Sequence, residues 1–122
     1  MTLETEALEA YERFYSTFAS RDVDGMERLW AEGIAVSCIH PGWMPLLGRE
    51  AVLASWRSIL NNPTQPRVVA GGATVTIVGN VAVVLCRELV SGSPLVATNV
   101  FVREGGAWRL MHHQGGPVAA AP

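Results

Sequence analysis

Residues 68–114 read VVAGGATVTIVGNVAVVLCRELVSGSPLVATNVFVREGGAWRLMHHQ, and this stretch decides the fold. Four apolar runs rich in Val, Ile and Leu are separated by three short groups of Gly, Asn, Ser and Pro, which favour tight turns. Consecutive strands joined by such turns pair antiparallel. The stretch therefore predicts an antiparallel meander with strands at 68–78, 81–90, 95–103 and 107–114.

The first sixty residues predict helices instead. Apolar residues recur every three or four positions, as in an amphipathic helix, at Leu3, Ala7, Leu8, Tyr11, Phe14, Tyr15 and Phe18. Asp22 suits the N-cap of a short second helix, and Gly48 precedes a third helix that ends before Pro63. Between these helices, residues 34–39 predict a strand and residues 40–45 a loop. Helices followed by a meander define an α+β fold with the helices on one face of the sheet.

The composition limits the function classes. The chain has 122 residues, of which 49% are hydrophobic and 16% charged, and we expect one domain over residues 1–122 with a tail that frays from about residue 115. A net charge of -2 offers no basic surface for nucleic acid. The sequence contains no lysine, which excludes Schiff-base chemistry.

We expect a cytoplasmic protein that does not associate with membranes. No apolar run approaches the ~20 residues of a membrane span. The first twelve residues are acidic and amphipathic, unlike a signal peptide. Cys38 and Cys86 lie in apolar segments, and reduced thiols are the simplest interpretation of them.

The turns also predict which side chains share a face of the sheet. A turn at 105–106 places Asn99 opposite His112, and a turn within 91–94 places Cys86 opposite Asn99. One face then carries Cys86, Glu88, Ala97, Asn99, Phe101, Leu110, His112 and Gln114. The other carries Arg87, Thr98, Val100, Arg109, Met111 and His113. A β-bulge would exchange the two sets.

The first face suits a small-molecule pocket, because it mixes apolar side chains with a few polar ones. The alternative is a solvated end of the sheet, since Glu88 and Gln114 lie near strand ends. Asn99, in mid-strand, favours the pocket. His40 is a second candidate, as a general base or hydrogen-bond donor, although a structural histidine bonded to loop backbone fits its position slightly better.

The tryptophans, the adjacent histidines and the cysteines give weaker indications of a functional site. We expect Trp43 to face a ligand, whereas Trp30 and Trp56 fit a pocket wall or the core. No metal site is predicted, because adjacent histidines on a strand point to opposite faces and the cysteines lack ligand spacing. A nucleophilic pair of Cys86 and His112 is disfavoured, because apolar surroundings raise a thiol pKa.

The strand at 81–85 is apolar on both faces, whereas an antiparallel sheet that faces water alternates. One face of the sheet is expected to pack on the helices. We expect the other to meet a second copy in a homodimer.

Several segments together resemble the SnoaL-like group of the nuclear transport factor 2-like superfamily, which also holds the ketosteroid isomerases. The segments are residues 14–26, 29–30, 40–43, 48–52, 55–56, 99–103 and 108–113. The resemblance spans roughly residues 5–118 and implies a cone-shaped barrel, in which a curved, mainly antiparallel sheet wraps around a long N-terminal helix and leaves an apolar pocket. It also implies dimers through the outer sheet face.

The isomerases of this group use a tyrosine and two aspartates. When this sequence is aligned with those isomerases on residues 22–25, Phe14 occupies the position of the tyrosine. Cys38 or His40 then occupies the position of the first aspartate, and Asn99 that of the second. These replacements argue against that mechanism. A dehydratase or isomerase without a cofactor remains open, in which His40 and His112 act as base and acid and Asn99 polarises a carbonyl.

We therefore expect a protein that holds a small apolar or aromatic ligand and is either a lyase or isomerase or only a binder. The expected ligand contacts are Phe14, Phe18, Trp30, Trp43, Trp56, Cys86, Glu88, Phe101 and Gln114. The alternative is a non-catalytic assembly domain that acts through the outer sheet face, as the kinase association domains of the superfamily do.

Overall fold

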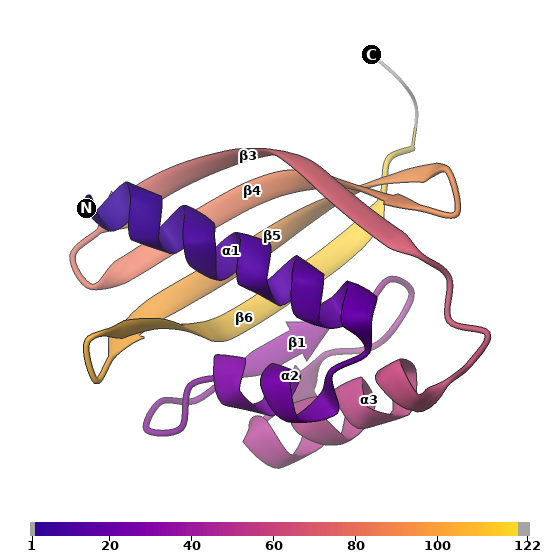
Figure 1. Cartoon of the computed structure of the whole chain (residues 1–122), viewed down its shortest axis with the longest axis horizontal. Coiled ribbons are helices and arrows are strands. Elements are labelled where there is room, and N and C mark those ends of the chain that lie inside the picture. Colours follow the sequence, from indigo (N-terminus) through magenta and orange to yellow (C-terminus); the bar gives the residue numbers. More distant parts are fainter. Residues whose placement is uncertain (1, 120–122) are drawn as a thin grey trace.

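The computed structural model describes residues 2–119 and contains three helices and one six-stranded sheet (Figure 1). The helices are α1 (Leu3–Ser20), α2 (Val23–Leu29) and α3 (Arg49–Asn61). The strands are β1 (Ser37–Ile39), β2 (Leu46–Leu47), β3 (Val68–Val78), β4 (Val81–Val90), β5 (Ser93–Glu104) and β6 (Ala107–Pro117). Their order is β2-β1-β6-β5-β4-β3. β1 runs parallel to β6 and the other named pairs are antiparallel, which confirms the α+β class with a mainly antiparallel sheet.

Helix α1 lies along one face of the curved strands β3–β6, and α2 and α3 lie beside β1 (Figure 1). Local capping explains where the first two helices begin and end. The Thr2 hydroxyl accepts a hydrogen bond from the Thr5 amide at 3.0 Å, and Arg21 ends α1 in the left-handed conformation. The Asp22 carboxylate then accepts from the Gly25 amide at 2.9 Å and begins α2, as predicted.

The β4–β5 hairpin differs from the predicted register by two residues. The turn consists of Ser91 and Gly92, both with positive φ, so Cys86 pairs with Ala97 and Asn99 pairs with Val84. A shift of two residues keeps each side chain on its predicted face. Cys86, Glu88, Ala97 and Asn99 are therefore all buried on the helix-facing side of the sheet.

A β-bulge in the β5–β6 pair overturns the predicted position of His112. Phe101 still pairs with Leu110, but Val100 pairs with His112 and Asn99 pairs with His113, so Met111 is the extra residue. Beyond the bulge the two faces exchange. His113 is buried against α1, whereas His112 lies on the opposite face and Gln114 is exposed.

The structure also corrects the bounds of two predicted strands and adds a strand that was not predicted. The first strand is limited to residues 37–39, and Ile34 lies outside it with 39% of its surface exposed. The loop at 40–45 leads into the two-residue strand β2, which no sequence pattern predicted. β6 continues to Pro117, past the predicted end at Gln114. Residues 120–122 of the tail that we expected to fray lie outside the described residues.

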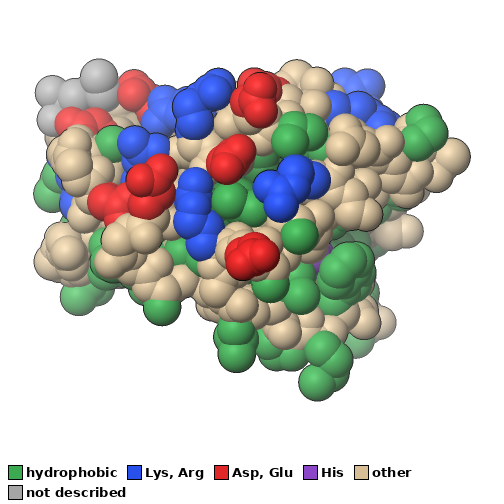
Figure 2. Space-filling model, turned by 90° about the horizontal axis from the view of Figure 1, so that it is seen from below, with side chains coloured by type: hydrophobic (Ala, Val, Ile, Leu, Met, Phe, Trp, Pro, Cys, Tyr) green, Lys and Arg blue, Asp and Glu red, His purple; other side chains and the backbone are tan. Residues whose placement is uncertain are grey.

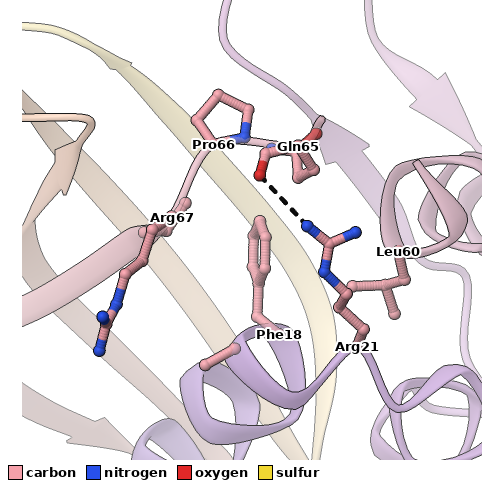
Figure 3. A pocket seen from close by; sticks show the side chains of 8 residues that line it. Phe18, Arg21, Leu60, Gln65, Pro66 and Arg67 are labelled. Carbon is pink, nitrogen blue, oxygen red and sulfur yellow. Dashed lines mark hydrogen bonds between the residues drawn. The ribbon is translucent and has the colours of Figure 1, made fainter. Parts of the chain in front are cut away.

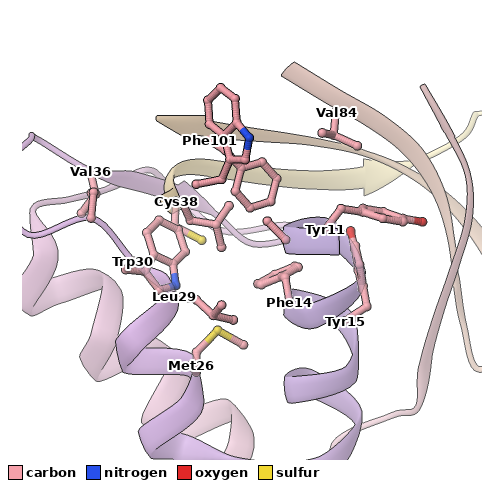
Figure 4. Packing of buried hydrophobic residues seen from close by; sticks show 14 of the residues in the cluster. Tyr11, Phe14, Tyr15, Met26, Leu29, Trp30, Val36, Cys38, Val84 and Phe101 are labelled. Carbon is pink, nitrogen blue, oxygen red and sulfur yellow. The ribbon is translucent and has the colours of Figure 1, made fainter. Parts of the chain in front are cut away.

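The core fills the space between α1, α2 and the sheet (Figure 4). Figure 4 shows Phe14 and Tyr15 on α1, Trp30 and Met26 from the α2 region, and Phe101 on the sheet side. Phe14 and Trp30 have no exposed surface. The burial of each large apolar side chain of this kind contributes about 1.5–3 kcal/mol to the stability of the fold, and so holds α1 against α2 and the sheet.

The surface is mixed in character. Figure 2 shows arginine and acidic side chains interleaved on the side of the molecule below the view of Figure 1, so this side carries no uniform basic stripe. The sheet face away from the helices carries exposed apolar side chains, including Val69, Leu85, Leu89 and Val96. No helix among the described residues is long and apolar enough to span a membrane.

Candidate functional site

A cavity of about 230 Å³ opens between the C-terminal part of α1, the helix α3 and the ends of β4 and β6; we call it the inner cavity. It is smaller than the ~300–1,000 Å³ of sites for drug-sized ligands. Its walls are mainly aromatic and apolar, with three ionisable side chains. The lining residues are Phe18, His40, Pro41, Trp43, Trp56, Ile59, Gln65, Val68, Glu88, Val90 and His113.

A chain of buried hydrogen bonds runs behind one wall of the inner cavity. The Tyr15 hydroxyl donates to Glu88 Oε2 at 2.5 Å, and Asn99 Nδ2 donates to the Tyr15 hydroxyl at 3.2 Å. This bond orients the Asn99 amide, so that its Oδ1 faces His113 Nδ1 at 2.5 Å. An amide oxygen can only accept, so His113 Nδ1 carries the proton and its Nε2 keeps a lone pair.

His40 is held from the other wall. Its Nε2 lies 2.9 Å from the Ser55 hydroxyl, which donates its own proton to the Val52 carbonyl at 2.7 Å. The serine is therefore the acceptor, and His40 carries its proton on Nε2. The His40 ring packs edge-to-face with Trp43 and Trp56, each at a centroid distance of 4.9 Å.

Burial keeps both imidazoles neutral. Burial lowers the pKa of His40 to about 4 and that of His113 to about 3, and for His113 electrostatic repulsion from His40 and, to a smaller extent, from His112 adds to the effect. The pKa of Glu88 shifts in the opposite direction: burial raises it, and the hydrogen bond from Tyr15 offsets part of this rise. Among the described residues, no arginine or histidine forms an ion pair with Glu88.

The two thiols are poor nucleophiles, as expected from their surroundings. Both cysteines are free and buried. Burial raises the pKa of the Cys38 thiol to about 12 and raises that of Cys86 as well.

Five of the predicted ligand contacts or catalytic residues line the inner cavity: Phe18, His40, Trp43, Trp56 and Glu88. Three more lie directly behind its walls. Asn99 and Cys86 contact Tyr15, and Phe14 packs on Trp56 and His113 at centroid distances of 5.5 and 5.0 Å.

The remaining four predicted site residues lie away from the inner cavity. Trp30 and Phe101 are fully buried core residues that do not line this cavity, and Gln114 is exposed. His112 accepts or donates a hydrogen bond at Ser37 Oγ, 2.7 Å away, on the far side of the sheet.

The sequence analysis missed Tyr15 and His113. Tyr15 belongs to the apolar stripe of α1, and its polar end becomes visible only when β4 brings Glu88 against it. His113 was assigned to the outer face because the bulge at Met111 was not predicted. The adjacent apolar residues Leu110 and Met111, which break the alternation of β6, are the one signal of that bulge in the sequence.

The three helices and the curved six-stranded sheet have the fold of the nuclear transport factor 2-like class of proteins. The family model of the SnoaL-like domain matches residues 7–120 of the chain. The chain therefore belongs to the SnoaL-like family.

Solved structures agree with this assignment. A proposed dehydratase of the NTF2-like family from Streptomyces avermitilis is 32% identical, with 96% of each chain covered and a TM-score of 0.86. A proposed association domain of a calcium/calmodulin-dependent protein kinase type II from Thiobacillus denitrificans is 31% identical, with 89% of this chain and 92% of that chain covered and a TM-score of 0.79.

A curated relative is the F-box protein SKIP8 of Arabidopsis thaliana. It is 28% identical over 109 residues, which cover 82% of this chain. The chain spans less than half, 44%, of the length of that protein.

Proposed function

We propose that the inner cavity binds a small, mainly apolar ligand and that the protein is a lyase or isomerase that works without a cofactor. The observation that carries the proposal is the pairing of a neutral imidazole, His113, with a buried carboxyl group, Glu88, on the walls of one cavity. The neutral imidazole keeps a lone pair on Nε2 that can accept a proton, and the carboxyl group can donate one, so the two groups can act as a base and an acid. The likeness to a proposed dehydratase supports the same reaction class.

In this proposal His113 is the base, in place of His112. Its Nε2 accepts a proton from a carbon of the ligand, and the Nδ1–H···Oδ1 bond to Asn99 holds the ring in the required tautomer. Asn99 is buried, does not line the cavity and bonds His113 and Tyr15 with the two ends of its amide, so in this proposal it is a positioning residue.

Glu88 supplies the acid. Its raised pKa extends to higher pH the range in which Glu88 is protonated, and the protonated form donates to a departing hydroxyl group. In a dehydration the C–H proton passes to His113, the C–O bond breaks, and the Glu88 proton leaves with the hydroxyl as water. Proton exchange with solvent then restores both groups. In an isomerisation His113 returns the proton to a second carbon instead. His40, fixed by Ser55, binds and orients the ligand with the ring of Trp43.

The first test is native mass spectrometry of the freshly purified protein, followed by denaturation in the same instrument. A released small molecule identifies the ligand class. Turnover is then measured on small β-hydroxy carbonyl compounds, through the absorbance of the conjugated alkene.

The matched variants are His113→Gln and His112→Gln, which are neighbours in sequence on opposite faces of β6. We expect His113→Gln to lower turnover about 100-fold or more, and His112→Gln to change it by less than about twofold. Equal effects of the two variants would contradict the assignment of His113.

A second candidate function rests on the outer sheet face. Val69, Leu85, Leu89 and Val96 are each about half-exposed there, around the exposed Arg87, and apolar side chains grouped on one exposed face mark interaction sites. We propose that this face joins two copies of the chain, so the protein acts as an assembly domain. The likeness to an association domain supports this. Light scattering on Leu85→Glu tests it: a dimeric parent and a monomeric variant support the interface, and a monomeric parent refutes it.

A further inference from the structure

A second cavity adjoins the inner one at the end of α1. It measures about 310 Å³, and we call it the outer cavity. Phe18, Gln65 and Val68 line both cavities, so the two cavities meet at these three side chains, and we refer to them as two lobes. Figure 3 shows the Phe18 ring between the side chain of Arg67 on one side and those of Arg21 and Leu60 on the other.

The two lobes differ in charge. The outer cavity is lined by two arginines, Arg21 and Arg67, and by no Asp or Glu of the described residues. The inner cavity is mainly aromatic and holds the neutral imidazoles. A ligand that fills both lobes therefore meets an apolar end and a cationic end.

Arg21 has a structural role in this wall. Its guanidinium group donates to the backbone carbonyls of Asn62, Pro63 and Gln65, and so holds the loop between α3 and β3 against the end of α1 (Figure 3). Most of its donors are used in this way. Arg21 shapes the outer cavity and adds positive charge to it.

Arg67 is different, because its side chain has no partner among the described residues. Within residues 2–119, no carboxylate lies within 4 Å of its guanidinium group and no side chain or backbone group forms a hydrogen bond with it. Its backbone is nevertheless fixed, since the Ser91 amide donates to the Arg67 carbonyl at 3.2 Å. Glu88, in the inner cavity, is bonded to Tyr15 and not to Arg67. Arg67 is therefore an exposed, planar cation that a fixed stretch of backbone carries at the edge of the outer cavity.

We infer that the ligand is a carboxylic acid whose carboxylate binds Arg67 in the outer cavity while its apolar part enters the inner cavity. This inference rests on the proposed function, because it uses the same inner cavity. The guanidinium fork matches a carboxylate in a bidentate geometry. Phe18, between the two lobes, contacts the apolar carbons next to the carboxylate.

The test uses two probes of the same shape and different charge, phenylacetate and phenylacetamide. Their binding is measured by NMR chemical-shift titration of the parent, of Arg67→Gln and of Arg57→Gln. Arg57 is the matched control, because it is an exposed arginine on α3 that lines neither cavity. The shifts of the Trp56 and His113 signals report occupation of the inner cavity.

We expect the parent to bind phenylacetate about fivefold more tightly than phenylacetamide, the size of a partly exposed ion pair. Arg67→Gln removes this preference and leaves phenylacetamide binding unchanged, whereas Arg57→Gln keeps it. High salt weakens the preference. If both probes bind equally well and Arg67→Gln changes nothing, the inference fails while the proposed binding function stands. If neither probe shifts the Trp56 or His113 signals, both fail.

Discussion

The removal of His113 is predicted to make the protein less sensitive to acid. The unfolded chain has a histidine pKa near 6.5, whereas burial lowers the pKa of His113 to about 3 in the native state. Between these values the unfolded state binds more protons than the native state, so the free energy of unfolding falls as the pH falls below about 6.5. His40 acts in the same direction, with a native pKa of about 4.

The magnitude follows from the pKa difference. At about pH 5, 1.5 pH units below the unfolded value, each buried imidazole costs about 2 kcal/mol of stability relative to about pH 7.5. Because His40 and His113 are only 4% and 3% exposed, solvent screening reduces this figure little. Glu88 contributes with the opposite sign: its raised pKa makes the native state gain stability as the pH falls.

The assay is urea denaturation followed by tryptophan fluorescence at about pH 7.5 and about pH 5, for the parent, His113→Gln and His112→Gln. Glu88 and His40 are present in all three, so the differences isolate the histidine that is removed. From about pH 7.5 to about pH 5, we expect the free energy of unfolding of His113→Gln to fall by about 2 kcal/mol less than that of the parent. The free energy of unfolding of His112→Gln should fall by as much as that of the parent. An unchanged pH dependence in His113→Gln would show that this imidazole is not buried in its neutral form, and would refute the basis of the proposed mechanism.

Three further predictions concern the packing around the site. Phe14→Ala removes a fully buried ring that packs on Trp56 and His113, and is expected to lower the free energy of unfolding by about 3–5 kcal/mol in urea denaturation; a loss below about 1 kcal/mol would contradict that packing. Cys38, whose thiol pKa burial raises to about 12, is expected to react with Ellman's reagent only on unfolding, and rapid reaction in the folded protein would contradict its burial. Gly115→Ala places a methyl group 3.2 Å from Glu88 Oε1, so it is expected to weaken phenylacetamide binding while the chain stays folded by circular dichroism, and unchanged affinity would place the ligand away from Glu88.

The helices and hairpins were predictable because their signals are local. The apolar stripe of α1 and the capping side chain of Asp22 lie within a few residues of the structure that they determine. The turns at 79–80 and 105–106 likewise mark the ends of β3, β4, β5 and β6. The turn at Ser91-Gly92 was misplaced because four turn-forming residues stand in a row, and only positive φ at the first two distinguishes the actual turn.

The site was less predictable because it depends on distant contacts. Which of two adjacent histidines faces inward depends on one extra residue, Met111, that the strand accommodates by bulging. Tyr15 gained its role from a hydrogen bond to Glu88, 73 positions away in the sequence. His40 was predictable as a candidate, since its place at the end of a strand before a rigid loop is visible in the sequence, but its partner Ser55 on α3 was not.

The adjacency of His112 and His113 affects how β6 tolerates insertions and deletions. The deletion of Met111 would remove the bulge and leave His113 opposite Asn99, whereas the insertion of one more residue before His112 would bring His112 to that place, so a histidine would still stand opposite Asn99. A gain or loss of one residue usually replaces every inward side chain of a strand by its neighbour. Here the doubled histidine makes the interior imidazole robust to such a change, so during divergence this strand can change length by one residue and keep the same group in the cavity wall.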